Sequence, residues 1–123
     1  MEIFWGKVIP GAKRGRTLGF PTANIAVHMD IAEGIYVAKI KHNTSWHNAL
    51  TFIGKAITFG AKKIYAETYV LDFSENLYGK YITIQLVEKL RENKKFDSVE
   101  DLIKQMKQDE VAAREFFKKK IRP

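Results

Sequence analysis

Apolar and polar residues alternate along most of this chain, and this period of two constrains the fold more than any other feature. In residues 81–90, Ile82, Ile84, Leu86 and Leu90 share one parity, and the other parity is mainly polar. Such alternation is typical of a strand with one buried face. Turn-forming residues separate similar runs, which predict six strands: Ile3–Ile9, Thr22–Val27, Gly34–Lys41, Trp46–Ile53, Tyr65–Phe73 and Tyr81–Leu90. The segment from Gly54 to Lys63 is expected to be a loop with a short extended piece.

The hydrophobic period changes to that of a helix near residue 98. Ser98 is a suitable N-cap, and Asp101 follows three residues later as a weaker form of the capping box. Val99, Leu102 and Met106 then recur at helical spacing, and Asp109 could cap a second helical stretch. Six short antiparallel strands followed by one or two helices predict a mainly β domain, a barrel with a helix packed against it.

Length and composition bound the possible functions. A chain of 123 residues fits one domain with its own core. Because the chain has no cysteine, disulfides and thiolate metal sites are excluded, which fits a reducing compartment. No apolar stretch is long enough to span a membrane, so we expect a cytoplasmic protein without a membrane partner. The three histidines have no metal-ligand spacing and are expected at the surface.

The net charge of +7 attracts polyanions, so nucleic acid and nucleotide phosphates are both candidate ligands. The basic residues are dispersed along the chain, which argues against a nucleic-acid stripe. We therefore expect no specific nucleic-acid partner, and only weak binding that lacks sequence preference. An RNA-binding barrel that stacks bases on Trp5, Trp46 and Tyr65 is the corresponding alternative.

The segment from Gly15 to Asn24 carries the most suggestive chemistry. Thr22 and Asn24 are two residues apart, so in a strand their side chains share one face. A hydroxyl and an amide oxygen are hard donors that suit Mg²⁺ beside substrate phosphates. Glycine lets backbone N–H groups approach a phosphate closely. The pattern indicates a phosphate and metal cradle, although a turn followed by an ordinary strand explains it as well.

Glu67 is the sharpest candidate for acid–base chemistry. On the predicted strand its face carries Tyr65, Tyr69 and Leu71, so a carboxylate lies among aromatic and apolar side chains. Burial disfavours the charged form of a carboxyl, which makes such a group a candidate general base. The alternatives are an exposed tyrosine-rich face or a pairing of Glu67 with a lysine.

The run Gly6-x-Val8, Gly11 and Gly15-Arg16-x-Leu18-Gly19-x-Pro21-Thr22-Ala23-Asn24 resembles the opening signature of ATP-dependent riboflavin kinases. Later blocks resemble that family in the same order: Gly34-Ile35-Tyr36, Glu67, Leu71-Asp72-Phe73, Leu77-Tyr78-Gly79-Lys80, Leu90-Arg91-x-x-Lys94-x-Phe96, Ser98-x-x-Asp101-Leu102, Asp109 and Ala113-Arg114. The resemblance implies one riboflavin kinase domain over residues 1–123. Its fold would be a six-stranded antiparallel Greek-key barrel with a C-terminal helix or helices.

The same resemblance implies a reaction and a role for each matching residue. A riboflavin kinase transfers the γ-phosphate of ATP to the 5′-hydroxyl of riboflavin and makes FMN, with Glu67 as general base and Mg²⁺ held by Thr22 and Asn24. The remaining family positions contact the nucleotide (Gly11, Gly15, Arg16, Val70, Asp72 and Tyr78) or the flavin (Arg91, Lys94 and Phe96). We expect a monomeric kinase module, either a stand-alone enzyme or one domain of a bifunctional FAD synthetase, whose partners are its small-molecule substrates, ATP and riboflavin.

Two departures from the family pattern support an alternative. Ile57 stands where the family has proline in a run before the strand of the catalytic glutamate, and Glu92 stands where proline follows Arg91. The altered loop around Ile57 motivates the alternative of a non-catalytic flavin- or nucleotide-binding barrel of the same fold. Neither change touches Thr22, Asn24 or Glu67, so an active kinase remains the favoured interpretation.

Overall fold

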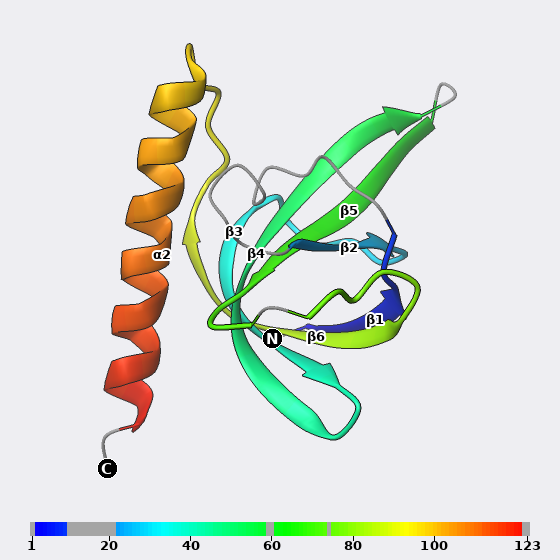
Figure 1. Ribbon diagram of the computed structural model, residues 1–123. Helices are drawn as coiled ribbons and strands as arrows, with labels where there is room; N and C mark the ends of the chain where they lie inside the picture. The colour runs from blue at the N-terminus through cyan, green and yellow to red at the C-terminus, as the bar shows by residue number, and fades with distance from the viewer. Residues whose placement is uncertain (1, 10–21, 59–60, 74, 122–123) are drawn as a thin grey trace.

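Six strands and one helix make up the computed structural model, which describes residues 2–9, 22–58, 61–73 and 75–121. The strands are β1 (Ile3–Lys7), β2 (Thr22–Val27), β3 (Gly34–His42), β4 (Ser45–Thr58), β5 (Ala61–Val70) and β6 (Tyr81–Arg91), and the helix is α2 (Val99–Ile121). The strands curve into a barrel, and α2 lies beside it along nearly its whole height (Figure 1).

All strand pairs are antiparallel, and the sheet order is β1-β6-β3-β4-β5-β2. The two edge strands meet at a seam, where Ile9 N–H donates to the Asn24 carbonyl at 2.8 Å. At this seam a Cβ on Gly6 would lie 3.3 Å from Ile25 Cβ, so glycine lets the edges approach. The prediction of a six-stranded antiparallel barrel with a C-terminal helix is confirmed.

The barrel interior is filled by alternate residues of every strand. On β6 the inward residues are Ile82, Ile84 and Leu86, as the period of two predicts. Leu90 is the exception, because register shifts in the β3–β6 ladder interrupt the alternation beyond Leu86. Leu90 therefore packs in a second cluster, outside the barrel.

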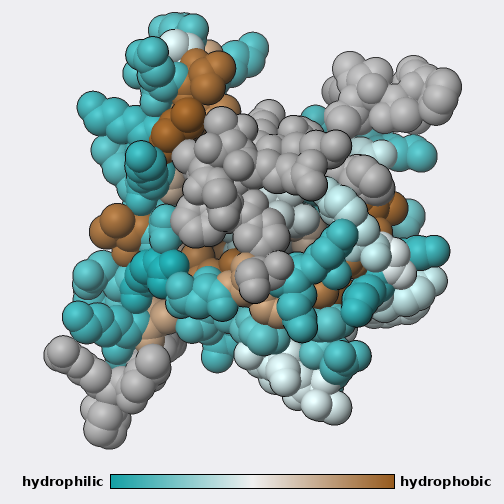
Figure 2. Space-filling view, in the orientation of Figure 1, coloured by the Kyte–Doolittle hydropathy of each residue, from teal (hydrophilic) through white to brown (hydrophobic). Residues whose placement is uncertain are grey.

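The second cluster joins α2 to the outer face of the sheet. Ile35, Val37 and Leu50 on β3 and β4 pack with Ala113 and Phe117 of the helix. The inner face of β3 and β4 packs in the barrel and the outer face packs against α2. Because both faces are covered, the central residues of these two strands are almost all apolar. Figure 2 shows that the visible surface of the helix is mostly hydrophilic, with hydrophobic patches near its N-terminal end and near its middle.

The ends of several elements differ from the sequence predictions. The segment expected to be a loop is a long hairpin instead, since β4 and β5 stay paired from Gly54↔Tyr65 to Thr58↔Ala61. The strand expected to reach Phe73 ends at Val70, because Asp72 has a φ of 56°, which breaks an extended strand. The first strand likewise ends at Lys7, before Ile9.

The C-terminal helix begins as predicted and then continues without a break. Ser98 Oγ accepts a hydrogen bond from Asp101 N–H at 3.1 Å, which confirms Ser98 as the N-cap. Asp109 caps no second helix, since it lies within one helix of 23 residues. Its carboxylate instead accepts two hydrogen bonds from Arg91, at 2.8 Å from Nε and 2.7 Å from Nη2.

The ion pair of Arg91 with Asp109 fastens the helix to the end of β6. The side chains are only 20% and 9% exposed, so removal of one partner leaves a largely buried charge. We expect Asp109→Ala to lower the free energy of unfolding by about 2–4 kcal/mol. Chemical denaturation measures this change.

The matched control for this variant is Asp72→Ala, which also removes an aspartate paired with an arginine of α2. The Asp72 side chain is 77% exposed, so its loss should change the unfolding free energy much less. Equal effects of the two substitutions would contradict a fastening role for Asp109.

Candidate active site

The outward faces of β2 and β5 bring together three polar residues singled out in the sequence. In the β2–β5 ladder Asn24 is directly opposite Glu67, and Thr22 is opposite Tyr69. Directly opposed residues of an antiparallel pair project from the same face, so a hydroxyl, an amide and a carboxylate share one surface. All three are nearly buried, with exposed fractions of 9% for Thr22, 5% for Asn24 and 9% for Glu67.

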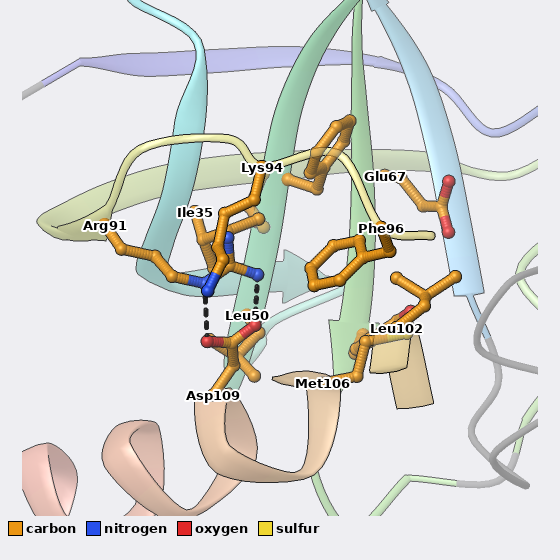
Figure 3. A pocket seen from close by; sticks show the side chains of 12 residues that line it. Ile35, Leu50, Glu67, Arg91, Lys94, Phe96, Leu102, Met106 and Asp109 are labelled. Carbon is orange, nitrogen blue, oxygen red and sulfur yellow. Dashed lines mark hydrogen bonds and ion pairs between the residues drawn. The ribbon is translucent and has the colours of Figure 1, made fainter. Parts of the chain in front are cut away.

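Burial of Glu67 agrees with the apolar face predicted for its strand. The alternating residues Ala66, Thr68 and Val70 turn into the barrel, and Glu67 turns outward yet remains buried. The alternative of an exposed tyrosine-rich face is therefore wrong. In Figure 3 the Glu67 carboxylate is directed toward β2, which agrees with the register of the two strands.

Thr22 and Asn24 each bury a polar atom that has no hydrogen-bond partner among the described residues, namely Thr22 Oγ1 and Asn24 Nδ2. Buried polar atoms are normally satisfied, so a pair of orphans on one face suggests a site for a ligand. The oxygen and nitrogen of an asparagine amide exchange places by a 180° flip, so Asn24 can present either a donor or an acceptor. The donor set thus fits a hard cation such as Mg²⁺.

A cavity of about 140 Å³ opens beside Glu67, between the outer face of the barrel and α2. Its apolar walls include Phe96 from the segment between β6 and α2, and Leu102 and Met106 from the helix. Glu67 lies toward one side, and Arg91 with Asp109 toward the other (Figure 3). An apolar slot with polar groups at two ends suits a flat, polar-edged ring system.

The polar end of the cavity is built from a chain of hydrogen bonds. Lys94 Nζ lies 3.2 Å from Gln105 Oε1, and Gln105 Nε2 donates to Asp109 Oδ1 at 3.0 Å. Asp109 in turn accepts from Arg91. Lys94 Nζ also lies 5.9 Å from the centre of the Phe96 ring, within cation–π range. The structure therefore brings Arg91, Lys94 and Phe96 to one cavity with Glu67.

The residues expected to contact the nucleotide do not line this cavity. Val70 turns into the barrel core, so only its backbone is available to a ligand. Asp72 is exposed and accepts two hydrogen bonds from Arg114 at 3.1 Å, which lower the pKa of its carboxyl. Tyr78 packs against the barrel core from a loop. Gly11, Gly15 and Arg16 lie outside the described residues.

Sequence reasoning missed the contribution of α2 to the cavity. Leu102, Met106 and Asp109 fall at i, i+4 and i+7 on one helix face, and this spacing alone predicts only a packed helix. The signal that could have revealed the cavity is Asp109, because it is an aspartate on an otherwise apolar face of the helix. Met106 also touches the sheet, since its sulfur accepts a hydrogen bond from the Tyr69 hydroxyl at 3.4 Å.

Three broader findings concern the described residues. No group of three or more His, Cys, Asp and Glu side chains within them could hold a metal ion. None of the described helix is long and apolar enough to cross a bilayer. The prediction that all histidines lie at the surface is wrong for His42, which is buried with its ring edge-on to Phe73.

Comparison with known proteins gives consistent matches over nearly the whole chain. The model of the riboflavin kinase family, Flavokinase, matches residues 3–117. The bifunctional riboflavin kinase/FMN adenylyltransferase of Listeria monocytogenes is 42% identical over 118 residues, which cover 93% of this chain and 38% of that protein. The chain thus spans well under half the length of this curated relative.

Solved structures give the same picture of the fold. A crystal structure described as a macrolide-efflux protein from Streptococcus pneumoniae superposes with a TM-score of 0.82 and 33% identity, over 91% of this chain and 38% of that one. The riboflavin kinase of Trypanosoma brucei has a TM-score of 0.65 and 22% identity, over 95% of this chain and 80% of that one. At that identity the second likeness concerns the fold alone.

Proposed function

The chain belongs to the riboflavin kinase family, and we propose that it transfers the γ-phosphate of ATP to the 5′-hydroxyl of riboflavin, giving FMN and ADP. The observation that carries this proposal is the opposition of Asn24 and Glu67 across β2 and β5, at the side of an apolar cavity. This arrangement puts a buried carboxylate next to two unsatisfied polar side chains, where a hydroxyl and a phosphate could meet.

In this mechanism the flavin ring occupies the cavity. Phe96 provides a flat apolar wall, and Arg91 and Lys94 face the polar edge of the ring from the other end. The ribityl chain then extends toward β2 and presents its 5′-hydroxyl to Glu67. Positioning of this kind is the main contribution that a protein makes to phosphoryl transfer.

Glu67 accepts the proton of the 5′-hydroxyl while the hydroxyl oxygen forms its bond to the γ-phosphorus. The bond from the γ-phosphorus to the bridging oxygen of ATP breaks, and that oxygen leaves with ADP. The near-complete burial of Glu67 suits it to this role, since a desolvated carboxylate is a stronger base than one in water.

Thr22 Oγ1 and the Asn24 amide would hold Mg²⁺ against the ATP phosphates, on the evidence of their unsatisfied buried atoms. The bound ion would neutralise phosphate charge. The proposal assigns Gly11, Gly15 and Arg16 to the phosphate loop, and Val70, Asp72 and Tyr78 to nucleotide contacts, through the backbone in the case of Val70. ATP and riboflavin are the partners of the proposed monomer.

Replacement of the proposed base tests the chemical step. We expect Glu67→Gln to reduce FMN formation by about 10²–10⁴-fold, because the amide cannot accept the hydroxyl proton. Steady-state FMN production measures the effect, and calorimetry should show that ATP still binds. Glu88→Gln, at an exposed position of β6, is the matched control and should retain wild-type turnover. Near-normal turnover in Glu67→Gln would remove this residue from the mechanism.

Substitution of the proposed metal ligands tests the cradle. Thr22→Ala and Asn24→Ala should each weaken Mg²⁺-dependent ATP binding, because each removes one oxygen donor from the same ion. Titration of Mg²⁺ at fixed ATP gives the half-saturating concentration. Thr22→Ser keeps the hydroxyl and should behave like the wild type, as should Ser45→Ala at an exposed site. If both alanine variants bind Mg²⁺ and ATP normally, the cradle assignment is wrong.

Loss of the aromatic wall should separate flavin binding from nucleotide binding. We expect Phe96→Ala to weaken riboflavin or FMN by about tenfold, with little change in ATP affinity, because the ring loses its stacking surface. Quenching of flavin fluorescence reports the first affinity. Phe96→Tyr should preserve it, and Val99→Ala, at the exposed start of α2, is the control. An equal loss for both ligands would indicate disturbed helix packing instead.

A further inference from the structure

Both tryptophans of the chain lie exposed on the outer surface of the barrel, and Trp46 borders the C-terminal half of α2. Trp5 on β1 is 69% exposed and Trp46 on β4 is 46% exposed. A large aromatic side chain is costly to leave in water, and the chain has only two tryptophans. Their joint exposure therefore calls for an explanation that the proposed kinase site does not supply.

The strand register places the two tryptophans in one row across four neighbouring strands. Trp5 is opposite Thr83, Thr83 is opposite Lys41, and Lys41 is opposite Trp46. Three strand spacings of 4.7–4.9 Å separate the ends of the row, which gives about 14 Å. The next row along the strands is Ile3, Gln85, Lys39 and Asn48. We call these two rows, with Lys7 and Tyr81 beside them, the tryptophan face.

The tryptophan face is positively charged. Lys7, Lys39 and Lys41 are its charged residues, it contains no carboxylate, and none of the three forms an ion pair with a described residue. Lys41 Nζ lies 5.9 Å from the centre of the Trp46 ring. Asp72, which shares a surface hollow with Trp46, is held by Arg114. The face thus matches a partner that is anionic and carries flat rings.

A groove of about 610 Å³ adjoins the tryptophan face at the seam between β1 and β2. Trp5 and Tyr81 form one side, with ring centres 6.0 Å apart and planes tilted by 49°. Ile9 and Met29 add exposed apolar surface within the groove. The groove therefore has room for an aromatic ring of a ligand that does not stack in line with the ligand's other rings.

We propose that the tryptophan face binds single-stranded nucleic acid without sequence preference. Bases stack on Trp5, Tyr81 and Trp46, and the lysines between these rings neutralise the phosphates, the combination found in sequence-independent binders of single strands. A 14 Å row accommodates two or three nucleotides, so the contact is short and its affinity modest. The site shares no residue with the cavity beside Glu67 and does not depend on the proposed kinase activity.

The native protein reports on this binding directly, because both tryptophans lie at the proposed site. We expect a 12-nucleotide oligo(U) or oligo(A) to quench tryptophan fluorescence, with micromolar dissociation constants at 50 mM NaCl. Neutralisation of three phosphates predicts a fall in affinity of about tenfold between 50 and 150 mM NaCl. No quenching by either oligonucleotide at 50 mM NaCl would overturn the proposal.

Variants separate stacking from general charge attraction, with labelled oligonucleotides and fluorescence anisotropy as the readout. Trp5→Ala and Trp46→Ala should each weaken binding by about fivefold or more, and Trp46→Phe should retain most of it. The double variant Lys39→Glu/Lys41→Glu should abolish binding. Lys104→Glu/Lys107→Glu makes the same charge change at exposed positions of α2 and should have little effect.

Three further outcomes would overturn the proposal. An equal loss in the two lysine double variants would mean that only net charge attracts the oligonucleotide. Binding of a 12-base-pair duplex as tight as that of the single strand would exclude base stacking. Binding to vesicles with 30% anionic lipid, without binding to oligonucleotides, would identify the face as a membrane contact, a setting in which exposed tryptophan and lysine are also favoured.

Discussion

The packing of α2 on the outer face of β3 and β4 is the interaction on which the candidate site depends. A small barrel fills its own interior with side chains, so a ligand cavity has to form outside it. Ala113 and Phe117 seat the C-terminal half of the helix on the sheet, and the Arg91–Asp109 pair fixes the helix at its middle. The N-terminal half, with Leu102 and Met106, then forms one wall of the cavity. The same contact thus stabilises the domain and creates the site.

Much of the fold was predictable from local patterns. Alternation identified the six strands, and Ser98 marked the start of the helix. The hairpin around residues 54–65 was missed because its sequence lacks the alternation of a half-buried strand. The continuous helix was missed because Asp109 is a suitable N-cap residue by its type. Only the folded structure shows that its carboxylate accepts hydrogen bonds from Arg91 instead. Such errors arise where a tertiary contact decides between two local options.

The candidate site was predictable only in part, for the same reason. The spacing of Thr22 and Asn24 predicts a shared face, but no local pattern gives the register that sets Asn24 against Glu67. The tryptophan face shows more clearly what local sequence patterns cannot predict. Trp5, Lys41 and Trp46 are spread along the chain, yet they lie in one row of the sheet. Residues that seem dispersed in the sequence can therefore form one surface.

A buried hydrogen bond inside the barrel has a consequence for the reliability of assembly. Thr51 and Thr68 are opposite each other on β4 and β5, and their hydroxyls lie 2.9 Å apart in a mainly apolar interior. A slip of β5 by one residue would turn Thr68 out of the barrel and Glu67 into it, and would leave the Thr51 hydroxyl in the interior without its partner, at a cost of about 1–3 kcal/mol. The pair therefore favours the register in which Glu67 lies on the outer face, opposite Asn24, so a contact inside the barrel helps to specify the site outside it.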